Sequence, residues 1–443
     1  MKHSLRDATL SRVTSAVRSQ MASGVFARGA FSYLVAFAGI SVASFVFHLL
    51  VSRLLGPTHY GAMGALLGII SLLSVPLGAV QIAVTQAVLD EEMSGQPFSM
   101  VRVTWRSFLA GCAAMVLLGA LAPLIDQFLH IGSALPVLLV AAWTPLATVS
   151  AVLQGALIGE FRFRPVAFAS FVGTGLVRLA LGELMVSAGL GVSGAVAATI
   201  FAQAFTMFSL MFSARHELRG HRHAAVVRTR MRDTLLSVAA LAGYTTLIGI
   251  DTFLAQHFFS SSLAGKYAAV AVAAHIAFFI PAALVTVAFP HLADGKGVDT
   301  SSRRIFRQTL RVSVVLSVLA AVVMSVLPTL TVRILFGAQY AGAASILGQL
   351  SFASVAVGLL ILFVYLHLAR RSVLALTPWV GVVLAVVGIS LFHDSSAAVA
   401  RVMLVVSVAT MALAGVPALR WRVEHPDPLP ASPPDDADPW RVT

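Results

Sequence analysis

The sequence predicts an all-α polytopic membrane protein with about twelve transmembrane helices. Of its 443 residues, 58% are hydrophobic and only 11% are charged, which is more apolar surface than a soluble core of this size can bury. The apolar stretches repeatedly exceed the roughly 20 residues that a helix needs to cross about 30 Å of hydrocarbon. The sequence lacks the alternating segments of about ten residues that build membrane β-barrels, so helices must satisfy the backbone hydrogen bonds in lipid.

Polar connections divide the apolar sequence into two groups of six predicted spans. The first apolar run starts near residue 30 and is too long for the core of a cleavable signal peptide, so we expect it to stay as the first span. The predicted spans are 30–54, 61–88, 106–126, 135–158, 165–188, 192–214, 233–258, 264–290, 310–334, 342–368, 374–392 and 396–419.

The predicted domains follow the same division. The N-terminal segment 1–29 fits either an amphipathic helix on an anionic leaflet or a plain basic tail. Residues 30–214 and 233–419 are expected to form two six-helix lobes, with residues 215–232 as a basic linker between them. Residues 420–443 are rich in proline and acidic side chains, so we expect a disordered tail.

The distribution of basic residues predicts the orientation. Twenty-five of the 30 Lys and Arg residues lie on the same side as the two termini. Because cytoplasmic loops carry the excess of basic residues, both termini and the linker are predicted to be cytoplasmic. The opposite side keeps only Arg53, Lys266, Arg333 and Arg401, and Arg178 lies within a span. This bias accounts for the formal net charge of +12, so nucleic acid is not an expected partner.

The two groups of spans share a pattern that indicates an internal duplication. An offset of 204 residues places Gly61 on Gly265 and Asp90 on Asp294. The paired segments, "RLLGPTHYGAMGAL" and "HFFSSSLAGKYAAV", are each predicted to form a very short outer turn between the first two helices of a lobe. Repeats of this kind are typical of transporters, whose sites lie between the repeats.

Four prolines, Pro76, Pro145, Pro281 and Pro378, lie within predicted spans. Each removes one backbone donor and is expected to bend its helix. Bendable helices in both lobes suit a protein whose lobes rock against each other.

Several motifs resemble, in order and position, those of the oligosaccharide flippases. These motifs are "SRLLGPTHYG", "IDTFLAQHFFSSSLAGKYAAVAVAA", "VAFPHLA" and "LFGAQYAGAASIL". The flippases are polysaccharide-export members of the superfamily that also holds the multidrug and toxic compound extrusion (MATE) antiporters and the peptidoglycan lipid flippase. The residues that carry the resemblance are Arg53, Gly56, Tyr60, Gly61, Asp251, Gly265, Tyr267, Pro290, Gly337 and Tyr340.

The resemblance covers about residues 25–420, with two departures. Met63 stands where the pattern usually has an aromatic residue, and the loop before Gly265 is rich in serine. The resemblance implies two pseudo-symmetric six-helix lobes around a central cavity that opens alternately to either side. It also implies a multi-pass protein of the bacterial inner membrane.

Arg178 is the most deeply placed charge, and a charged side chain inside hydrocarbon costs at least about 2.5 kcal/mol. Glu183 lies five positions further along, which is a poor spacing for a partner on the same helix. One interpretation is that Arg178 lines the cavity and binds a pyrophosphate or an acidic sugar, since a guanidinium offers a planar fork to phosphate. The other is that Arg178 pairs with an acidic side chain on another helix.

Asp251, His48 and His257 are the candidate ion-coupling residues. Asp251 lies well inside the second lobe, where it either carries a proton or a sodium ion or forms a structural pair. His48 and His257 lie at a similar depth and either titrate during transport or serve as packing residues.

Arg53, Lys266 and Arg333 are further candidate substrate-binding residues. They are positive charges at the outer ends of their spans, on the side where basic residues are otherwise rare. Arg53 either snorkels to the phosphates of outer lipids or gathers anionic headgroups as they are released.

These features predict a flippase that moves an undecaprenyl-pyrophosphate-linked oligosaccharide by alternating access. Its partners would be this lipid-linked glycan, membrane lipids and, through the acidic tail, polysaccharide-synthesis enzymes. An ion-coupled multidrug antiporter of the MATE type is the alternative, and a facilitator-type sugar transporter lacks its usual Gly-Asp-Arg signature in "LDEEMSGQPFSMVR".

An integral-membrane glycan polymerase or glycosyltransferase ranks lower. No outer connection is long enough to hold paired carboxylates over the membrane, so we predict no catalysis. Cys112 is the only cysteine, which excludes a disulfide within the chain and a cysteine-based metal site. No cofactor or metal is expected, and the sequence lacks the G-x-x-x-x-G-K phosphate-binding loop that would bind ATP.

Overall fold

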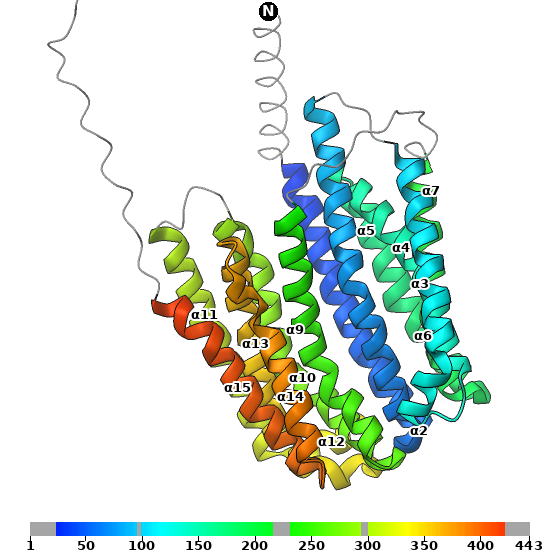
Figure 1. Ribbon diagram of the computed structural model, residues 1–443, viewed down its shortest axis with the longest axis vertical. Coiled ribbons are helices and arrows are strands. Elements are labelled where there is room, and N and C mark those ends of the chain that lie inside the picture. Colours follow the sequence, from blue (N-terminus) through cyan, green and yellow to red (C-terminus); the bar gives the residue numbers. More distant parts are fainter. Residues whose placement is uncertain (1–23, 95–98, 216–230, 294–299, 421–443) are drawn as a thin grey trace, which may run out of the picture.

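The structure is a computed structural model, and it describes residues 24–94, 99–215, 231–293 and 300–420. Every regular element within these ranges is a helix (Figure 1). Most of the predicted N-terminal segment 1–29, linker 215–232 and tail 420–443 lies outside the described residues.

The described residues contain ten helical runs that are long and apolar enough to cross a membrane. Two of them, Val35–Val88 and Phe163–Ser213, each cover two predicted spans. The predicted all-α fold with about twelve membrane crossings is therefore confirmed.

The N-terminal half begins with α2, in which two helices follow each other and the chain reverses direction between them. The other helices of this half pack around α2. Its fifth predicted span is not a uniform α-helix, because two π-helices, η1 and η2, interrupt it. The elements are α2 (Gly24–Ser94), α3 (Met100–Leu129), α4 (Leu135–Gly159), α5 (Phe163–Ser170), η1 (Phe171–Val177), α6 (Arg178–Met185), η2 (Val186–Leu190) and α7 (Gly191–Ser213).

The C-terminal half repeats the layout with α9 to α15, and η3 and η4 are short 3₁₀ helices. The elements are α9 (Met231–Phe258), α10 (Ser261–Ala293), α11 (Thr300–Val326), α12 (Pro328–Phe336), η3 (Ala338–Ile346), α13 (Leu347–Ala369), η4 (Val373–Leu376), α14 (Thr377–Leu391) and α15 (Ser396–Arg420).

Proline explains two differences from the predicted spans. The predicted helix 310–334 is broken at Leu327, and Pro328 opens α12, because proline has no N–H for the preceding helix. Pro378 does not bend a span from within, as predicted, but lies in the first turn of α14. A missing N–H has no cost in a first turn, where backbone donors have no partner within the helix.

A single residue, Gly56, turns the chain between the first two spans inside α2. Its φ is 68° and its ψ is 171°, a combination that essentially only glycine adopts. The chain reverses direction there, at the lower end of Figure 1. We call this end, which holds Gly56 and the α3–α4 and α9–α10 connections, the turn end. The opposite end, where α2 ends at Ser94 and α9 begins at Met231, is the loop end.

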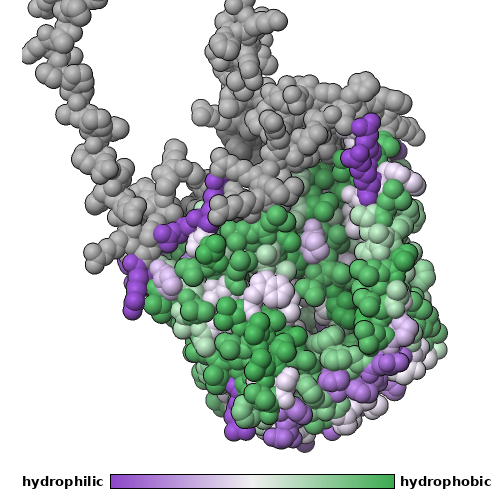
Figure 2. Space-filling model, viewed as in Figure 1, coloured by the Kyte–Doolittle hydropathy of each residue, from purple (hydrophilic) through white to green (hydrophobic). Residues whose placement is uncertain are grey.

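Apolar side chains cover the outside of the helices between these two ends. Figure 2 shows hydrophobic residues over the middle of the molecule and hydrophilic residues toward both ends. Large apolar side chains are more exposed than a soluble surface allows, for example Val116 (67%), Leu124 (63%) and Val405 (67%). This surface matches a lipid environment, and the chain is a multi-pass membrane protein.

The two halves touch at the turn end. Gly61 of α2 lies against the first turns of α10, and a Cβ atom placed on it would be 2.9 Å from the backbone nitrogen of Gly265. A Cβ atom on Gly64 would lie 3.6 Å from Thr252 of α9. Gly68 occupies the same face as Gly61 two turns further along, and a Cβ atom there would meet nothing within 4 Å. The close packing near the turn end thus gives way to open space beside Gly68.

Candidate functional site

Close packing of the fifth span on the first positions Arg178. A Cβ atom placed on Gly175 would lie 3.6 Å from Ala43 of α2, and Gly182 faces the ring of Phe47. Arg178 lies on the same helical face, because it is three residues after Gly175 and four residues before Gly182. It is the first residue of α6, directly after η1. Short π-helical segments within α-helices are frequent at functional sites.

The guanidinium of Arg178 has no carboxylate partner among the described residues. It lies over the ring of Phe47, with Cζ 4.2 Å from the ring centroid, and Nη1 donates to the hydroxyl of Ser44 at 3.3 Å. Its Nε is buried without a hydrogen-bond partner. The described part of the chain contains a different salt bridge, between Arg162 and Glu160. A cation–π contact and one hydroxyl leave the positive charge of Arg178 unneutralised.

His48 extends the polar cluster along α2. Its Nδ1 is 2.9 Å from the hydroxyl of Tyr60. The side chain of Tyr60 is fully buried. The ring of Tyr60 in turn packs edge-on against that of Tyr340 of η3, with centroids 6.1 Å apart. The cluster therefore contains side chains of both halves.

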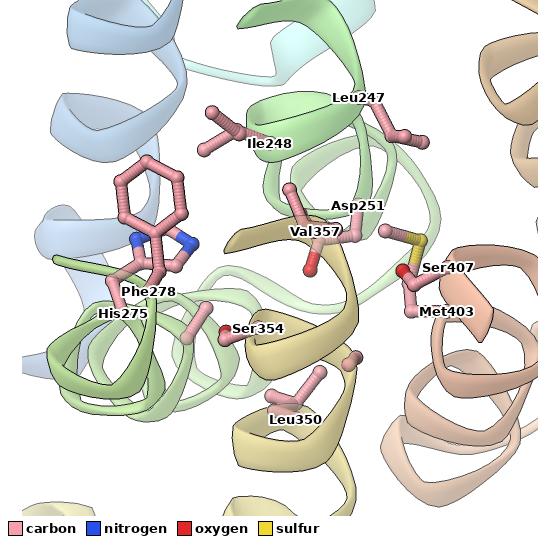
Figure 3. A pocket seen from close by; sticks show the side chains of 12 residues that line it. Leu247, Ile248, Asp251, His275, Phe278, Leu350, Ser354, Val357, Met403 and Ser407 are labelled. Carbon is pink, nitrogen blue, oxygen red and sulfur yellow. The ribbon is translucent and has the colours of Figure 1, made fainter. Parts of the chain in front are cut away.

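A small pocket lies within the C-terminal half (Figure 3). It is lined by residues of α9, α10, α13 and α15. Four polar side chains, Asp251, His275, Ser354 and Ser407, interrupt a lining that is otherwise apolar.

The carboxylate of Asp251 is buried, and each oxygen accepts a hydrogen bond. Oδ2 accepts from the hydroxyl of Tyr267 at 2.9 Å, and Oδ1 accepts from the backbone N–H of Thr252 at 2.7 Å. No Lys, Arg or His of the described residues forms a salt bridge with it. Asp251 lines the pocket together with the hydroxyls of Ser354 and Ser407, so the group has the chemistry to bind a proton or a small cation.

The outer cations of the sequence analysis gather around α12 and η3. Arg53 donates through Nε to the carbonyl of Leu335 at 3.2 Å and through Nη2 to the carbonyl of Ile334. Arg333 is exposed on α12. The Nζ atom of Lys266 lies 3.9 Å from the position that a Cβ atom would take on Gly342 of η3.

His257 lies apart from His48, at the turn end. Its Nδ1 is 2.8 Å from the carbonyl of Phe128, and its ring stacks on that of Phe128 with centroids 3.9 Å apart. The predicted site residues therefore divide into a central group, with Arg178, His48 and Asp251, and a group at the turn end.

Sequence reasoning did not single out His275, Phe47 or Ser44. His275 is a polar residue in the otherwise apolar predicted span 264–290, so its position was a usable signal. Phe47 and Ser44 carried no signal, because their role depends on which face of α2 meets α6. The described residues contain no group of three or more His, Cys, Asp or Glu side chains that could hold a metal ion.

The fold is that of the MATE transporters and their relatives. The chain is similar to the lipid II flippase MurJ in an inward closed conformation, with a TM-score of 0.64 at 13% identity over 87% of this chain and 88% of that one. It is similar to an inward-facing MATE family multidrug resistance transporter, with a TM-score of 0.62 at 13% identity over 86% and 93% of the two chains. A transporter of the same superfamily from Pyrococcus furiosus gives 0.59 at 14% identity over 89% and 94%.

Sequence comparison supplies the family. No curated protein sequence is a significant match to the chain. The family model described as "Polysaccharide biosynthesis protein" matches residues 50–345, which is more than half of the chain. The matched residues include Arg178, Asp251 and the predicted site residues at the turn end, which are Arg53, His257, Lys266 and Arg333. The chain therefore belongs to the polysaccharide biosynthesis protein family.

Proposed function

We propose that this protein is a flippase that moves a lipid-linked oligosaccharide, of the undecaprenyl-pyrophosphate type, across the bacterial inner membrane. The observation that carries the proposal is the unpaired guanidinium of Arg178 in the middle of a membrane span. A charge without a carboxylate partner is costly in lipid, and an anionic headgroup that enters the cavity would offset this cost. Family membership supports a role in polysaccharide synthesis.

The open space beside Gly68 suggests the path of the headgroup. The loop end carries most of the basic residues, so it is assigned to the cytoplasm, and the turn end faces outward. A phosphate that enters from the loop end would be bound by Arg178, whose guanidinium lies over Phe47, the neighbour of His48. Rocking of the halves would then open the turn end while the lipid tail stays in the bilayer.

Ion coupling is assigned to Asp251, with His48 and His257 as the further candidates. Asp251 is buried within one half and faces a pocket with two hydroxyls, so a proton or a sodium ion bound there would alter the packing of that half alone. Arg53, Lys266 and Arg333 would meet the headgroup at the turn end. The protein is proposed to catalyse no chemical reaction.

Ion-coupled export of drugs is the second candidate, favoured by the acidic pocket around Asp251. An antiporter for cationic drugs would use acids in its central cavity. The central group contains one acid, Asp251, whose oxygens both accept hydrogen bonds, and one arginine, Arg178, without a carboxylate partner among the described residues. The unpaired charge of Arg178 favours an anionic substrate.

The test is export of surface glycan in the source bacterium after deletion of the chromosomal copy. Complementation with Arg178→Gln is expected to reduce export at least about tenfold, the effect of losing one hydrogen bond to a charged group. Arg178→Lys keeps the positive charge but loses the planar guanidinium that can bind a phosphate through two N–H groups, so it should restore part of the export. Arg401→Gln, which removes an exposed arginine of α15, is the matched control and should export normally.

Protein levels in the membrane are measured alongside export. Normal export by Arg178→Gln at a normal protein level would refute the role of Arg178. Loss of dye resistance with intact surface glycan in the deletion strain would favour the drug antiporter.

A further inference from the structure

Hydrogen bonds between the two halves at the turn end share one design. In each, a side chain of one half reaches a backbone carbonyl at the C-terminal end of a helix in the other half. The last four carbonyls of a helix have no partner within the helix. The acceptors are the carbonyls of Ser52 and Arg53, before the turn in α2, of Phe128 and Leu129, at the end of α3, and of Ile334 and Leu335, at the end of α12.

Arg53 and η3 hold each other reciprocally. The guanidinium of Arg53 caps the last turn of α12, where a cation is also favoured by the helix dipole. In return, Tyr340 of η3 donates its hydroxyl to the carbonyl of Ser52 at 2.6 Å. Gln339 donates to the carbonyl of Arg53 at 3.5 Å. The end of each helix is thus capped by the other half.

The end of α9 caps α3 in the same manner. Nε2 of Gln256 donates to the carbonyl of Leu129 at 2.9 Å, and Nδ1 of His257 bonds the carbonyl of Phe128. The rings of His257 and Phe128 stack beside this bond, only 3° from parallel.

We propose that these five side chains, Arg53, Gln256, His257, Gln339 and Tyr340, form a latch that keeps the turn end closed. When the halves part, each donor and each carbonyl is left at the end of the helix bundle, where water can bond it. Exchange of a protein hydrogen bond for a water bond changes the free energy by only about 0.5–1.5 kcal/mol. Tyr60, Phe336 and Tyr340 also pack together across this end, so the latch adds directional hydrogen bonds to an apolar contact. The hydrogen bonds of the latch are therefore released at little cost on opening, whatever the cargo.

The test measures distances at both ends of the full-length protein in lipid nanodiscs. In a Cys112→Ser background, spin labels are placed on Thr58→Cys and Leu330→Cys at the turn end. A second pair, Phe168→Cys and Val373→Cys, reports on the loop end. Double electron–electron resonance gives the populations with the turn end closed and open.

Arg53→Gln is expected to raise the ratio of open to closed turn ends about tenfold or more, because Arg53 makes two hydrogen bonds as a charged donor. In the sample that carries the second label pair, the distance at the loop end should shorten, which general loosening of the fold would not produce. Arg53→Lys should recover part of the closed population, because an ammonium still donates to a carbonyl. Arg401→Gln, which removes an exposed arginine of α15 that bonds a carbonyl of its own helix, should match the wild type.

Tyr340→Phe removes a single hydroxyl from the latch and is the second variant, should Arg53→Gln fail to fold. It should shift both distances in the same directions by a smaller amount. Unchanged distances in both variants, or an equal shift in Arg401→Gln, would overturn the latch. These readouts need no substrate, so they are independent of whether the cargo is a lipid-linked glycan.

Discussion

At the scale of single residues, Gly265 limits how closely the two halves approach. A Cβ atom at this position would overlap the backbone carbonyl of Pro57. The internal repeat predicted that Gly61 and Gly265 are equivalent, but not that they touch. The equivalence of Gly61 and Gly265 follows from comparing the sequences of the two halves. Their contact depends on how the halves pack against each other, and the sequence pattern of one half contains no information on that.

Gly265→Ala should therefore force the turn end apart. Overpacking of this kind typically costs about 1–3 kcal/mol, and here the strain falls on the closed conformation. We expect a longer distance between labels at positions 58 and 330, together with reduced export. Gly68→Ala is the control, since a Cβ atom there meets open space; an equal effect of both substitutions would contradict the assignment.

Arg178 shows how far sequence reasoning reaches at this scale. Its depth and charge marked it as a candidate, because apolar spans make any arginine conspicuous. The sequence left open whether an acidic side chain neutralises it, since partners on other helices depend on tertiary packing. Its contacts with Phe47 and Ser44 contain no carboxylate.

At the scale of elements, hydropathy predicted where spans lie but not how each helix is shaped. The fifth span was predicted as one helix over 165–188, whereas the structure has two π-helical segments around α6. Apolar content reports the length of a membrane helix, and α- and π-helices satisfy their backbone groups equally well in lipid. The break at Pro328 was readable in principle, because proline favours a first turn.

The turn within α2 depends on Gly56, whose backbone conformation is strained for other residues. Gly56→Ala should lower stability by about 1–3 kcal/mol, measured as a drop in the melting temperature of the purified protein in detergent. Gly78→Ala, also in α2 but with helical geometry and open space around it, should be neutral or slightly stabilising. A melting temperature of Gly56→Ala equal to that of the wild type would show that the turn tolerates a side chain.

At the scale of the whole molecule, composition alone predicted the fold class, and the repeat predicted its two halves. What the sequence did not contain is which end of the gap is closed. Two conformations of one chain share every local pattern, so only contacts between the halves distinguish them, such as the packing of Gly61 and Gly64 and the hydrogen bonds of Arg53.

The predicted orientation can be tested by labelling single cysteines in intact cells in a Cys112→Ser background. A cysteine at His59, exposed at the turn end, should react with a membrane-impermeant maleimide. A cysteine at His223, in the linker, should react only after permeabilisation, because the basic excess keeps the linker in the cytoplasm. Labelling of position 223 in intact cells would invert the topology and the direction of transport.

The latch receives its hydrogen bonds on backbone carbonyls, and this shapes how the protein can diverge. Every amino acid supplies the same carbonyl, so mutations at Phe128, Leu129, Ile334 and Leu335 would preserve the acceptors as long as the helix ends stay in place. The donors have no such freedom. Over evolutionary time, descendants of this chain should therefore exchange acceptor residues readily while retaining an N–H or O–H group at positions 53, 256, 257 and 340.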